Sequence, residues 1–431
     1  MKILLVNPPN CGRSIPEERY GINSIRQIFR GEPLALEVLA GNLADHEVRI
    51  LDLKAEPESL HSTLDVFRPQ LVGFTAVTCE ANTVLRLAGE VKESCGAVVV
   101  VGGIHASSDP SFFNRPEIDY VIVGLGKASF AELAAAIEAG TTTGGIPGVA
   151  ATRPGEALLF TPRNFGLPDL VEQVPPRYDL VAAYRAGYTL SSIGSQIGMV
   201  ASAFGCPFRC SFCCISSQAG GRYLTHSVEA VIRDIRLLGT LPVIRLVDAN
   251  TFGNIGHARL LVEAIAAAGI RTNFIADVRS DTVVRHPELM RQWQEAGLRS
   301  VVIGFEEIAD NDLTFFNKEN KVAINNEAIS ILHELGITIV GDFIVSPDYD
   351  DARFEVLEEY VISRAIELPI LTVLTPLPGT ALYSELHERI TIRDLDYYTL
   401  TNAVTATRLG EKRFYQQYAR LMKQFHARAK L

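Results

Sequence analysis

"GCPFRCSFCC" at residues 205–214 decides the fold of this chain, because it gathers four of the seven cysteines within ten positions. Cys206, Cys210 and Cys213 follow a C-x3-C-x2-C spacing, and Pro207 stiffens the loop between them. Three thiolates on one short loop can bind three irons of a cubane cluster, which normally takes four thiolates. The stretch therefore predicts a [4Fe-4S] cluster whose fourth iron is open to another ligand.

Two other kinds of site could use the same cysteines. A structural zinc would bind Cys210 and Cys213 as a C-x2-C pair, but the second Cys or His pair of such sites does not follow in the sequence. A redox dithiol would need two cysteines and would leave Cys206 without a role. The remaining cysteines are expected to be structural, with a functional role left open for the first of them: Cys11, Cys79, Cys95 and Cys214.

The composition is that of a folded protein with no electrostatic attraction to nucleic acid. Of the 431 residues, 47% are hydrophobic and 21% are charged, and 40 Lys and Arg against 50 Asp and Glu give a net charge of −10. No apolar run reaches the length of a membrane span. The first residues, "MKILLVNPPN", are predicted to form a strand and not a signal peptide. We therefore expect a cytoplasmic protein, in which clustered cysteines serve as metal ligands or catalytic groups.

Residues 1–140 alternate between apolar strands and helices, which predicts a Rossmann-like parallel sheet of the flavodoxin type. The expected strands are 2–8, 47–53, 71–77, 96–104 and 118–124, and the expected helices are 31–45, 60–69, 79–93 and 128–140. Ligands of such sheets bind beyond the carboxyl ends of the strands. The residues at those ends are Asn7, Pro8, Pro9, Thr75, Thr78, Gly102, Gly103, His105, Gly124, Leu125 and Gly126.

The rest of the chain is predicted to hold a second α/β domain. Residues 141–195 are rich in Gly, Pro and Thr, which predicts a linker with a small hairpin. From 196 to 380, about six strand and helix units follow the cysteine loop, which is typical of a partial (β/α)6 barrel. Residues 381–431 are expected to form a helical C-terminal region. The fold class is therefore α/β throughout the first 380 residues.

The cysteine loop, with Phe212 before its third cysteine and βα units after it, resembles the radical S-adenosylmethionine (SAM) superfamily. The resemblance implies that the open iron binds SAM, which is cleaved to a 5′-deoxyadenosyl radical. It also implies SAM contacts at the strand ends "LVDAN", "IADVRSD" and "IGFEE", where Glu307 stands in place of the usual Ser. The implied SAM-binding residues are Phe212, Asp248, Asn250, Arg279, Asp281 and Glu306.

The order of the two domains resembles the cobalamin-dependent class of this superfamily. "NPP" (7–9), "GFTAVT" (73–78), "VGGIHAS" (101–107) and "DYVIVGLG" (119–126) resemble its cobalamin-binding domain, which implies cobalamin at the strand ends given above. Leu125 and Lys127 replace two acidic residues of the usual pattern. The D-x-H-x-x-G motif is absent, so cobalamin is expected to bind without a histidine below the cobalt.

"GFEE" (304–307), "TPLPGT" (375–380) and "TLTNAVTATRL" (399–409) are similar to the branch that contains hopanoid and bacteriochlorophyll C-methylases. The resemblance implies a methyltransferase that acts on an unactivated carbon of a hydrophobic small molecule, using the deoxyadenosyl radical and methylcobalamin. A low-potential flavodoxin or ferredoxin would supply the electron. The chemistry belongs to the cofactors, so no side chain is singled out as catalytic.

Two other functions share these motifs. An anaerobic oxidative cyclase or rearrangement enzyme, of the kind that acts on porphyrins, would use both cofactors without transferring a methyl group. A non-catalytic cobalamin or redox sensor would bind both cofactors without turnover, and it would be expected to carry an output module. The mass of the product separates the first alternative from a methylase, because methylation adds CH2 whereas oxidative cyclisation removes hydrogen.

Overall fold

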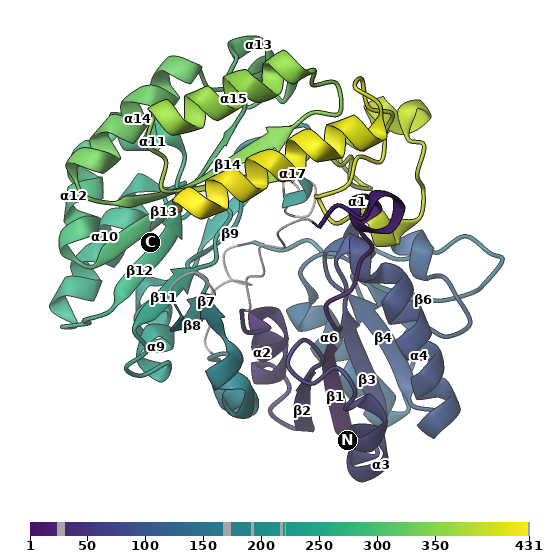
Figure 1. Cartoon of the computed structure of the whole chain (residues 1–431). Helices are drawn as coiled ribbons and strands as arrows, with labels where there is room; N and C mark the ends of the chain where they lie inside the picture. Colours follow the sequence, from purple (N-terminus) through teal and green to yellow (C-terminus); the bar gives the residue numbers. More distant parts are fainter. Residues whose placement is uncertain (24–30, 167–173, 191–193, 216–218, 220, 430–431) are drawn as a thin grey trace.

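The computed structural model describes residues 1–23, 31–166, 174–190, 194–215, 219 and 221–429. Two α/β halves lie side by side, the N-terminal half in purple and blue and the second half in teal and green (Figure 1). The long C-terminal helix α17 (Glu411–Arg428) runs along the second half. No helix among the described residues combines the length and the apolar character that a membrane span requires.

The N-terminal half is built on a six-stranded sheet in the order β2-β1-β3-β4-β5-β6. All neighbours pair in parallel except β5 and β6. The first five strands have the flavodoxin-type order, which confirms the predicted fold. The strands are β1 (Lys2–Asn7), β2 (Glu47–Asp52), β3 (Leu71–Thr75), β4 (Val98–Gly102), β5 (Tyr120–Ile122) and β6 (Val149–Ala151).

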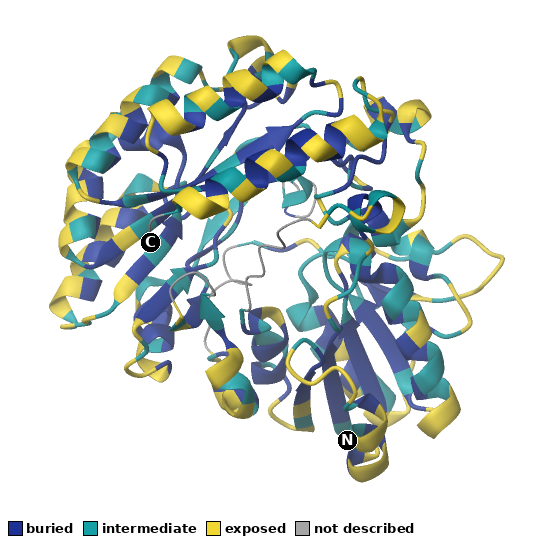
Figure 2. Cartoon of the chain, viewed as in Figure 1, coloured by how far each residue is buried: buried dark blue, intermediate teal, exposed yellow. Residues whose placement is uncertain are grey.

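Both faces of this sheet are covered by helices, which is why its strands read as continuous apolar runs. Leu4 and Val6 point to the face covered by α3 (Leu60–Phe67) and α4 (Ala81–Cys95). Ile3 and Leu5 point to the opposite face, under α2 (Leu34–Gly41) and α6 (Gly126–Ala139). Strands β1, β3 and β4 are accordingly dark blue, that is buried, in Figure 2. Short turns complete this half: α1 (Ile15–Tyr20), η1 (Thr78–Glu80), α5 (Ile104–Ser108) and η2 (Pro110–Phe113).

The second half is built on a seven-stranded sheet in the order β15-β14-β13-β12-β11-β8-β7. Six strands are parallel and β7 is antiparallel at one edge, so the curled sheet is a partial (β/α)6 barrel, as predicted. The strands are β7 (Thr189–Leu190), β8 (Ser195–Val200), β11 (Val243–Leu246), β12 (Asn273–Asp277), β13 (Leu298–Glu306), β14 (Thr338–Val345) and β15 (Leu368–Val373). The helices between them are α9 (Val228–Leu237), α10 (Ile255–Ala267), α11 (Ser280–Arg285), α12 (Pro287–Glu295), α13 (Asp310–Phe315), α14 (Val322–Glu334) and α15 (Asp351–Ser363).

The segment expected to be a linker contributes to both sheets. β6 adds an antiparallel strand to the first sheet, and β7 forms an antiparallel hairpin with β8 at the edge of the second sheet. The turn of that hairpin falls largely outside the described residues. The 3-10 segment η3 (Tyr178–Gly187) lies between β6 and β7 in the chain. The C-terminal region contains α16 (Ala381–Leu386), η4 (His387–Arg389), η5 (Leu395–Tyr397) and α17, joined by irregular segments.

Direct contacts fix the two halves against each other. The buried carboxylate of Glu32 accepts hydrogen bonds from Arg185 of η3 and from the backbone N–H of Met199 on β8. On the other side, the backbone N–H of Arg13 donates to the carbonyl of Asp396 at 2.7 Å. These contacts place the carboxyl edge of the first sheet next to the barrel.

Candidate functional site

A two-stranded stalk carries the cysteine loop, residues 206–213, which we call the Cys loop. β9 (Ala203–Gly205) leads into it and pairs antiparallel with β10 (Tyr223–Thr225). Gly205 has a φ of +81°, and a Cβ there would lie 2.1 Å from the carbonyl oxygen of Arg222. Only glycine fits at that crossing. The glycine of "GCP" therefore allows the chain to turn from the stalk into the Cys loop.

Segments of the barrel half that follow α13 and begin α16 hold the Cys loop in place. The N–H of Ser211 donates to the carbonyl of Phe316 at 3.0 Å, and its carbonyl accepts from the N–H of Leu382 at 2.9 Å. The side-chain amide of Asn317 donates to the carbonyl of Arg209 at 2.8 Å. The ring of Phe212 meets the edge of Phe316, with centroids 5.3 Å apart. Phe212 thus anchors the Cys loop in an apolar cluster after α13.

The three predicted ligand thiols lie close enough together to affect one another's pKa. Burial raises the pKa of Cys213 to about 12, and the neighbouring Cys214, Cys210 and Cys206 add to the increase. Burial also raises the pKa of Cys210, whereas Lys318 lowers it. Thiols in such a place become thiolates when a metal coordinates them. The donor set therefore suits an iron–sulfur cluster.

No three His, Cys, Asp or Glu side chains among the described residues converge on one point as the ligands of a single ion do. A cubane cluster differs from a single ion in this respect, because each thiolate binds its own iron.

Arg279 links the end of β12 to the Cys loop. Its guanidinium lies 3.5 Å from the centre of the Phe208 ring, close enough for a cation–π contact. The same group donates to Asp281 at 2.9 Å and to the backbone carbonyl of Lys318 at 3.0 Å. Asp281 is also paired with Arg285. The predicted residues Arg279 and Asp281 therefore lie together, and they hold the Cys loop and the segment after α13.

Glu306 ends β13 in an unusual conformation. Its φ is +64°, and the pairing of β13 with β14 shifts register between Gly304 and Glu306. The carboxylate accepts a hydrogen bond of 2.7 Å from the Nζ of Lys318, and both side chains are about nine-tenths buried. A Cβ at Gly304 would lie 2.1 Å from the Glu306 Oε1, so glycine makes room for this pair. Lys318, whose charge also lowers the pKa of Cys210, was not predicted from the sequence.

Asp248 and Asn250 follow β11, and their polar atoms differ in what they contact. The Asp248 carboxylate accepts from the N–H and hydroxyl of Ser202 at 2.7 and 2.5 Å and from the N–H of Ala203 at 2.8 Å. It therefore holds the start of the stalk. The side-chain amide of Asn250 is buried, and neither of its polar atoms has a hydrogen-bond partner among the described residues. A buried orphan amide of this kind suits a polar ligand.

A cavity of about 440 Å³ lies between the two halves, at the carboxyl edge of the first sheet. Six of the predicted cobalamin residues line it, and the barrel contributes the opposite wall through residues that include Phe204 and His226. The deep end reaches Leu5 and Phe130, between the sheet and α6. The six predicted residues are Thr75, Gly102, Gly103, Gly124, Leu125 and Gly126.

Gly103 shows why this edge of the sheet is built with glycine. It has a φ of +99°, and a Cβ would lie 2.7 Å from Thr75 Oγ1 and 2.8 Å from the Ala76 nitrogen. A side chain at this position would therefore collide with the chain at the end of β3, so glycine is needed where β4 turns into α5. We call this glycine-containing edge of the cavity the cradle.

The other predicted cobalamin residues do not line the cavity. Asn7 donates from its amide to Asp52 at 2.8 Å, and Pro8, Pro9 and Thr78 follow the same edge of the sheet without lining the cavity. His105 is fully buried between Phe112 and Phe113, because α5 begins at Ile104 and turns its ring into the domain. Burial lowers the pKa of His105 to about 4.

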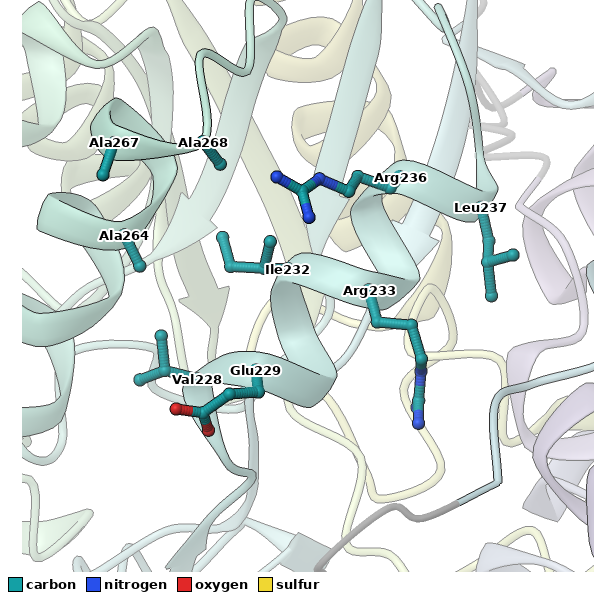
Figure 3. Close-up of a pocket in the computed structure, with 9 residues that line it drawn as sticks. All are labelled: Val228, Glu229, Ile232, Arg233, Arg236, Leu237, Ala264, Ala267 and Ala268. Atoms are coloured by element: carbon teal, nitrogen blue, oxygen red, sulfur yellow. The ribbon is translucent and has the colours of Figure 1, made fainter.

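A groove of about 640 Å³ between α9 and α10 is separate from these residues (Figure 3). Val228, Ile232 and Ala264 point into it, and Arg236 lies at its rim. It contains none of the residues predicted to bind a cofactor, so we do not assign it to the site.

Comparisons with known proteins agree with this geometry. Residues 28–134 match the B12 binding domain, and residues 200–361 match the Radical SAM superfamily. The chain is 31% identical to the hopanoid C-3 methylase of Methylococcus capsulatus over 90% of this chain and 75% of the relative. It is 29% identical to an anaerobic magnesium-protoporphyrin IX monomethyl ester cyclase of Cereibacter sphaeroides, over 80% of this chain and 58% of the relative.

Among solved structures, the radical SAM methyltransferase TsrM from Kitasatospora setae, with cobalamin and a [4Fe-4S] cluster bound, has the same fold. The two superpose with a TM-score of 0.75 at 19% identity, over all of this chain and 92% of that one. The cysteine loop, the cavity edge and these matches cover both halves of the molecule. The chain belongs to the family of radical SAM enzymes that carry a B12-binding domain.

Proposed function

We propose that this enzyme is a cobalamin-dependent methyltransferase that methylates an unactivated carbon of a small, mainly apolar molecule. The observation that carries the proposal is the placement of the cavity, whose barrel wall includes two residues of the stalk that carries the Cys loop. Ala203 and Phe204 of β9 line the cavity, and Cys206 lies two positions after Phe204. A ligand in the cavity and a cluster on the Cys loop are thus held by one short piece of chain.

The proposed cofactor contacts follow the geometry of each residue. Cys206, Cys210 and Cys213 would hold the [4Fe-4S] cluster, and the buried amide of Asn250 and the Lys318–Glu306 pair would bind polar groups of SAM. The glycine edge of the first sheet, with Thr75 and Leu125, would hold cobalamin. When bound, the cluster and SAM supply the 5′-deoxyadenosyl radical, and cobalamin supplies the methyl group.

The protein itself positions these groups and excludes water. Asp248 fixes the start of the stalk through three hydrogen bonds, and Arg279 fixes the Cys loop through Phe208. Glu306, Arg279 and Lys318 are each at most 9% exposed, so the polar end of the site is shielded from solvent. Shielding protects a radical from side reactions.

We further propose domain boundaries at 1–140, 141–195, 196–380 and 381–431, although β6 and β7 of the second segment join the neighbouring sheets. We also infer a low-potential electron donor of the flavodoxin or ferredoxin type and a cytoplasmic location. A cluster with an open iron needs both a reductant and a reducing compartment.

The two products of SAM test the proposed reaction. A SAM that donates its methyl group leaves S-adenosylhomocysteine, and a SAM that is cleaved leaves 5′-deoxyadenosine. The enzyme reconstituted without oxygen should form both in the presence of a reductant and a hopanoid, the substrate class named for the relative, with CH2 added to the product. Formation of 5′-deoxyadenosine alone would contradict methyl transfer.

The similarity to the magnesium-protoporphyrin cyclase favours one second candidate. An oxidative cyclase of this family would release 5′-deoxyadenosine without S-adenosylhomocysteine, and its product would lose hydrogen. The same measurement therefore separates the two candidates.

A further inference from the structure

One histidine lies in the wall of the cavity between the two halves, and the proposed function does not yet use it. His226 follows β10 of the stalk and precedes α9, which begins at Val228. It lines the cavity from the barrel side, across from the glycine edge of the first sheet. Among the described residues, His226 is the one polar member of this wall. The others are apolar: Ala201, Ala203, Phe204 and Val247.

Hydrogen bonds on both sides fix the backbone of His226. Its N–H donates to the carbonyl of Ser202 at 2.9 Å, and its carbonyl accepts from the Nε2 of His257 at 2.9 Å. Ser202 is in turn held by the carboxylate of Asp248. Both backbone polar groups of His226 are therefore used within the protein, and its imidazole ring is the part that remains for a ligand.

The ring of His226 is neutral and can still form hydrogen bonds. Among the residues that the structure describes, no group forms a hydrogen bond with this ring. Burial lowers the pKa of His226 to about 4, and the positive charges of Lys127, His257 and Arg233 lower it further. A neutral imidazole has one N–H donor and one nitrogen acceptor. The ring therefore suits a neutral polar partner, such as an amide.

Cobalamin, the ligand proposed for this cavity, carries amides on one of its two parts. Acetamide and propionamide side chains surround the corrin ring, whereas the nucleotide loop carries a phosphodiester and an aromatic base. The deep end of the cavity, at Leu5 and Phe130, is apolar and lies under α6. The barrel wall with His226 faces the carboxyl edge of the sheet, which is where ligands of such sheets bind. An amide-bearing ring at this edge would meet His226.

We propose that His226 binds cobalamin from the barrel side, through a hydrogen bond to an amide group on the rim of the corrin ring. The inference rests on the proposed function and deepens it, because it makes cobalamin a ligand of both halves of the molecule. His226 continues β10, which pairs with β9, and β9 leads into the Cys loop. One stalk thus holds both the corrin ring and the Cys loop.

The test compares two corrinoids that share the ring and its amides. Cobinamide lacks the nucleotide loop of cobalamin, and equilibrium dialysis gives the dissociation constant of each from the cluster-loaded enzyme. His226→Phe keeps a planar ring without hydrogen-bonding groups, so it should bind both corrinoids about tenfold more weakly than the wild type does. His226→Gln supplies a neutral donor and acceptor again, so it should bind both within about threefold of the wild type.

His286→Phe is the matched control, since His286 lies in the same half but does not line the cavity, and its side chain is 31% exposed. It should bind both corrinoids as the wild type does. The proposal is overturned if His226→Phe binds as well as His286→Phe, or if His226→Gln binds as weakly as His226→Phe. A loss confined to cobalamin would assign the contact to the nucleotide loop and would also overturn it.

Coordination of the cobalt is the other contact that the imidazole of His226 could make. The electron paramagnetic resonance spectrum of bound cob(II)inamide separates the two contacts, because a coordinated nitrogen splits the cobalt lines and cobinamide has no base of its own to do so. The wild type should show no such splitting. A splitting that disappears in His226→Gln would assign His226 to the cobalt and overturn the amide contact. Failure of the proposed function has another readout, because the wild type would then bind neither corrinoid.

Discussion

The guanidinium of Arg279 lies 3.5 Å from the centre of the Phe208 ring, so a residue at the end of β12 holds a residue inside the Cys loop. The two are 71 positions apart in the sequence, since 279 minus 208 is 71. Arg279 is also bonded to the carbonyl of Lys318, whose side chain pairs with Glu306. One arginine thus connects three segments around the proposed cluster.

Replacing Arg279 should loosen the cluster without unfolding the barrel. A buried cation–π contact stabilises by about 1–2 kcal/mol, which corresponds to about tenfold in a rate or an affinity. We expect Arg279→Ala to lose iron to a chelator about tenfold faster than the wild type. Arg285→Ala is the control, since Arg285 pairs with the same Asp281 but its side chain is 68% exposed. Equal rates of iron loss in the two variants would contradict this role.

Gly103 should be required for cobalamin binding. A Cβ would approach Thr75 Oγ1 to 2.7 Å at a φ of +99°, so Gly103→Ala would push the edge of the cavity out of place. We expect this variant to retain less than about a tenth of the cobalamin of the wild type after desalting, because strain of this kind costs about 1–3 kcal/mol. Its iron content should be unchanged.

Gly140→Ala separates the steric clash from the backbone strain. Gly140 also has a positive φ, +63°, but nothing lies within 4 Å of its Cβ position. This variant should keep its cobalamin, as measured by the visible spectrum. A Gly103→Ala protein that binds cobalamin as well as Gly140→Ala does would show that the cradle is not used.

The carboxyl of Glu37 predicts a pH dependence of stability. Glu37 is fully buried, and burial with the nearby Glu32 raises its pKa to about 9. Between pH 4.5 and 9 the folded protein keeps a proton that the unfolded chain has lost, so stability falls as the pH rises. The slope is at most about 1.4 kcal/mol per pH unit.

Glu37→Gln should remove this slope, because an amide does not titrate. We expect its melting temperature to fall less between pH 6 and 9 than that of the wild type, by calorimetry. Glu47→Gln, at an exposed position on β2, should follow the wild type. The account of the buried carboxyl is wrong if all three proteins lose stability in parallel.

Asn402 should be needed to keep the N-terminal segment on the C-terminal region. Its Oδ1 accepts from the N–H of Ile15 at 2.9 Å, and its Nδ2 donates to the carbonyls of Arg13 and Tyr397 at 2.8 and 2.9 Å. The side chain is fully buried, so Asn402→Ala leaves several polar groups unpaired.

We expect this variant to lose about 2–4 kcal/mol and to be cut faster by protease near residues 11–23. Asn42→Ala removes an amide that makes one bond, to the carbonyl of Val38, and should change little. If protease cuts the N-terminal segment of Asn402→Ala no faster than that of Asn42→Ala, Asn402 does not hold this segment in place.

The fold was predictable from the sequence because its strands are apolar runs separated by turns. Strands buried on both faces, such as β1 and β4, have no other place in a folded protein. The Cys loop was predictable for a similar reason, since its ligands lie within eight positions of each other. Local patterns of this kind can be recognised without knowing how distant segments of the chain pack.

Contacts between distant segments were not predictable in the same way. Lys318 lies in an irregular stretch after α13, and it reaches Glu306 only because β13 shifts register beside Gly304. His105 was expected at the ligand edge, but α5 turns its ring toward Phe112 and Phe113. The path of the backbone decides both cases, and local sequence patterns do not reveal that path.

The most direct test of the two-cofactor account is the iron and cobalt content of the protein reconstituted without oxygen. The wild type should hold about four irons, as a cubane cluster requires, and one cobalamin per chain. Cys213→Ala should lose its iron and keep its cobalamin, whereas Cys214→Ala, one position away, should keep both. Iron without cobalamin in the wild type, or a cluster that survives in Cys213→Ala but not in Cys214→Ala, would contradict the account.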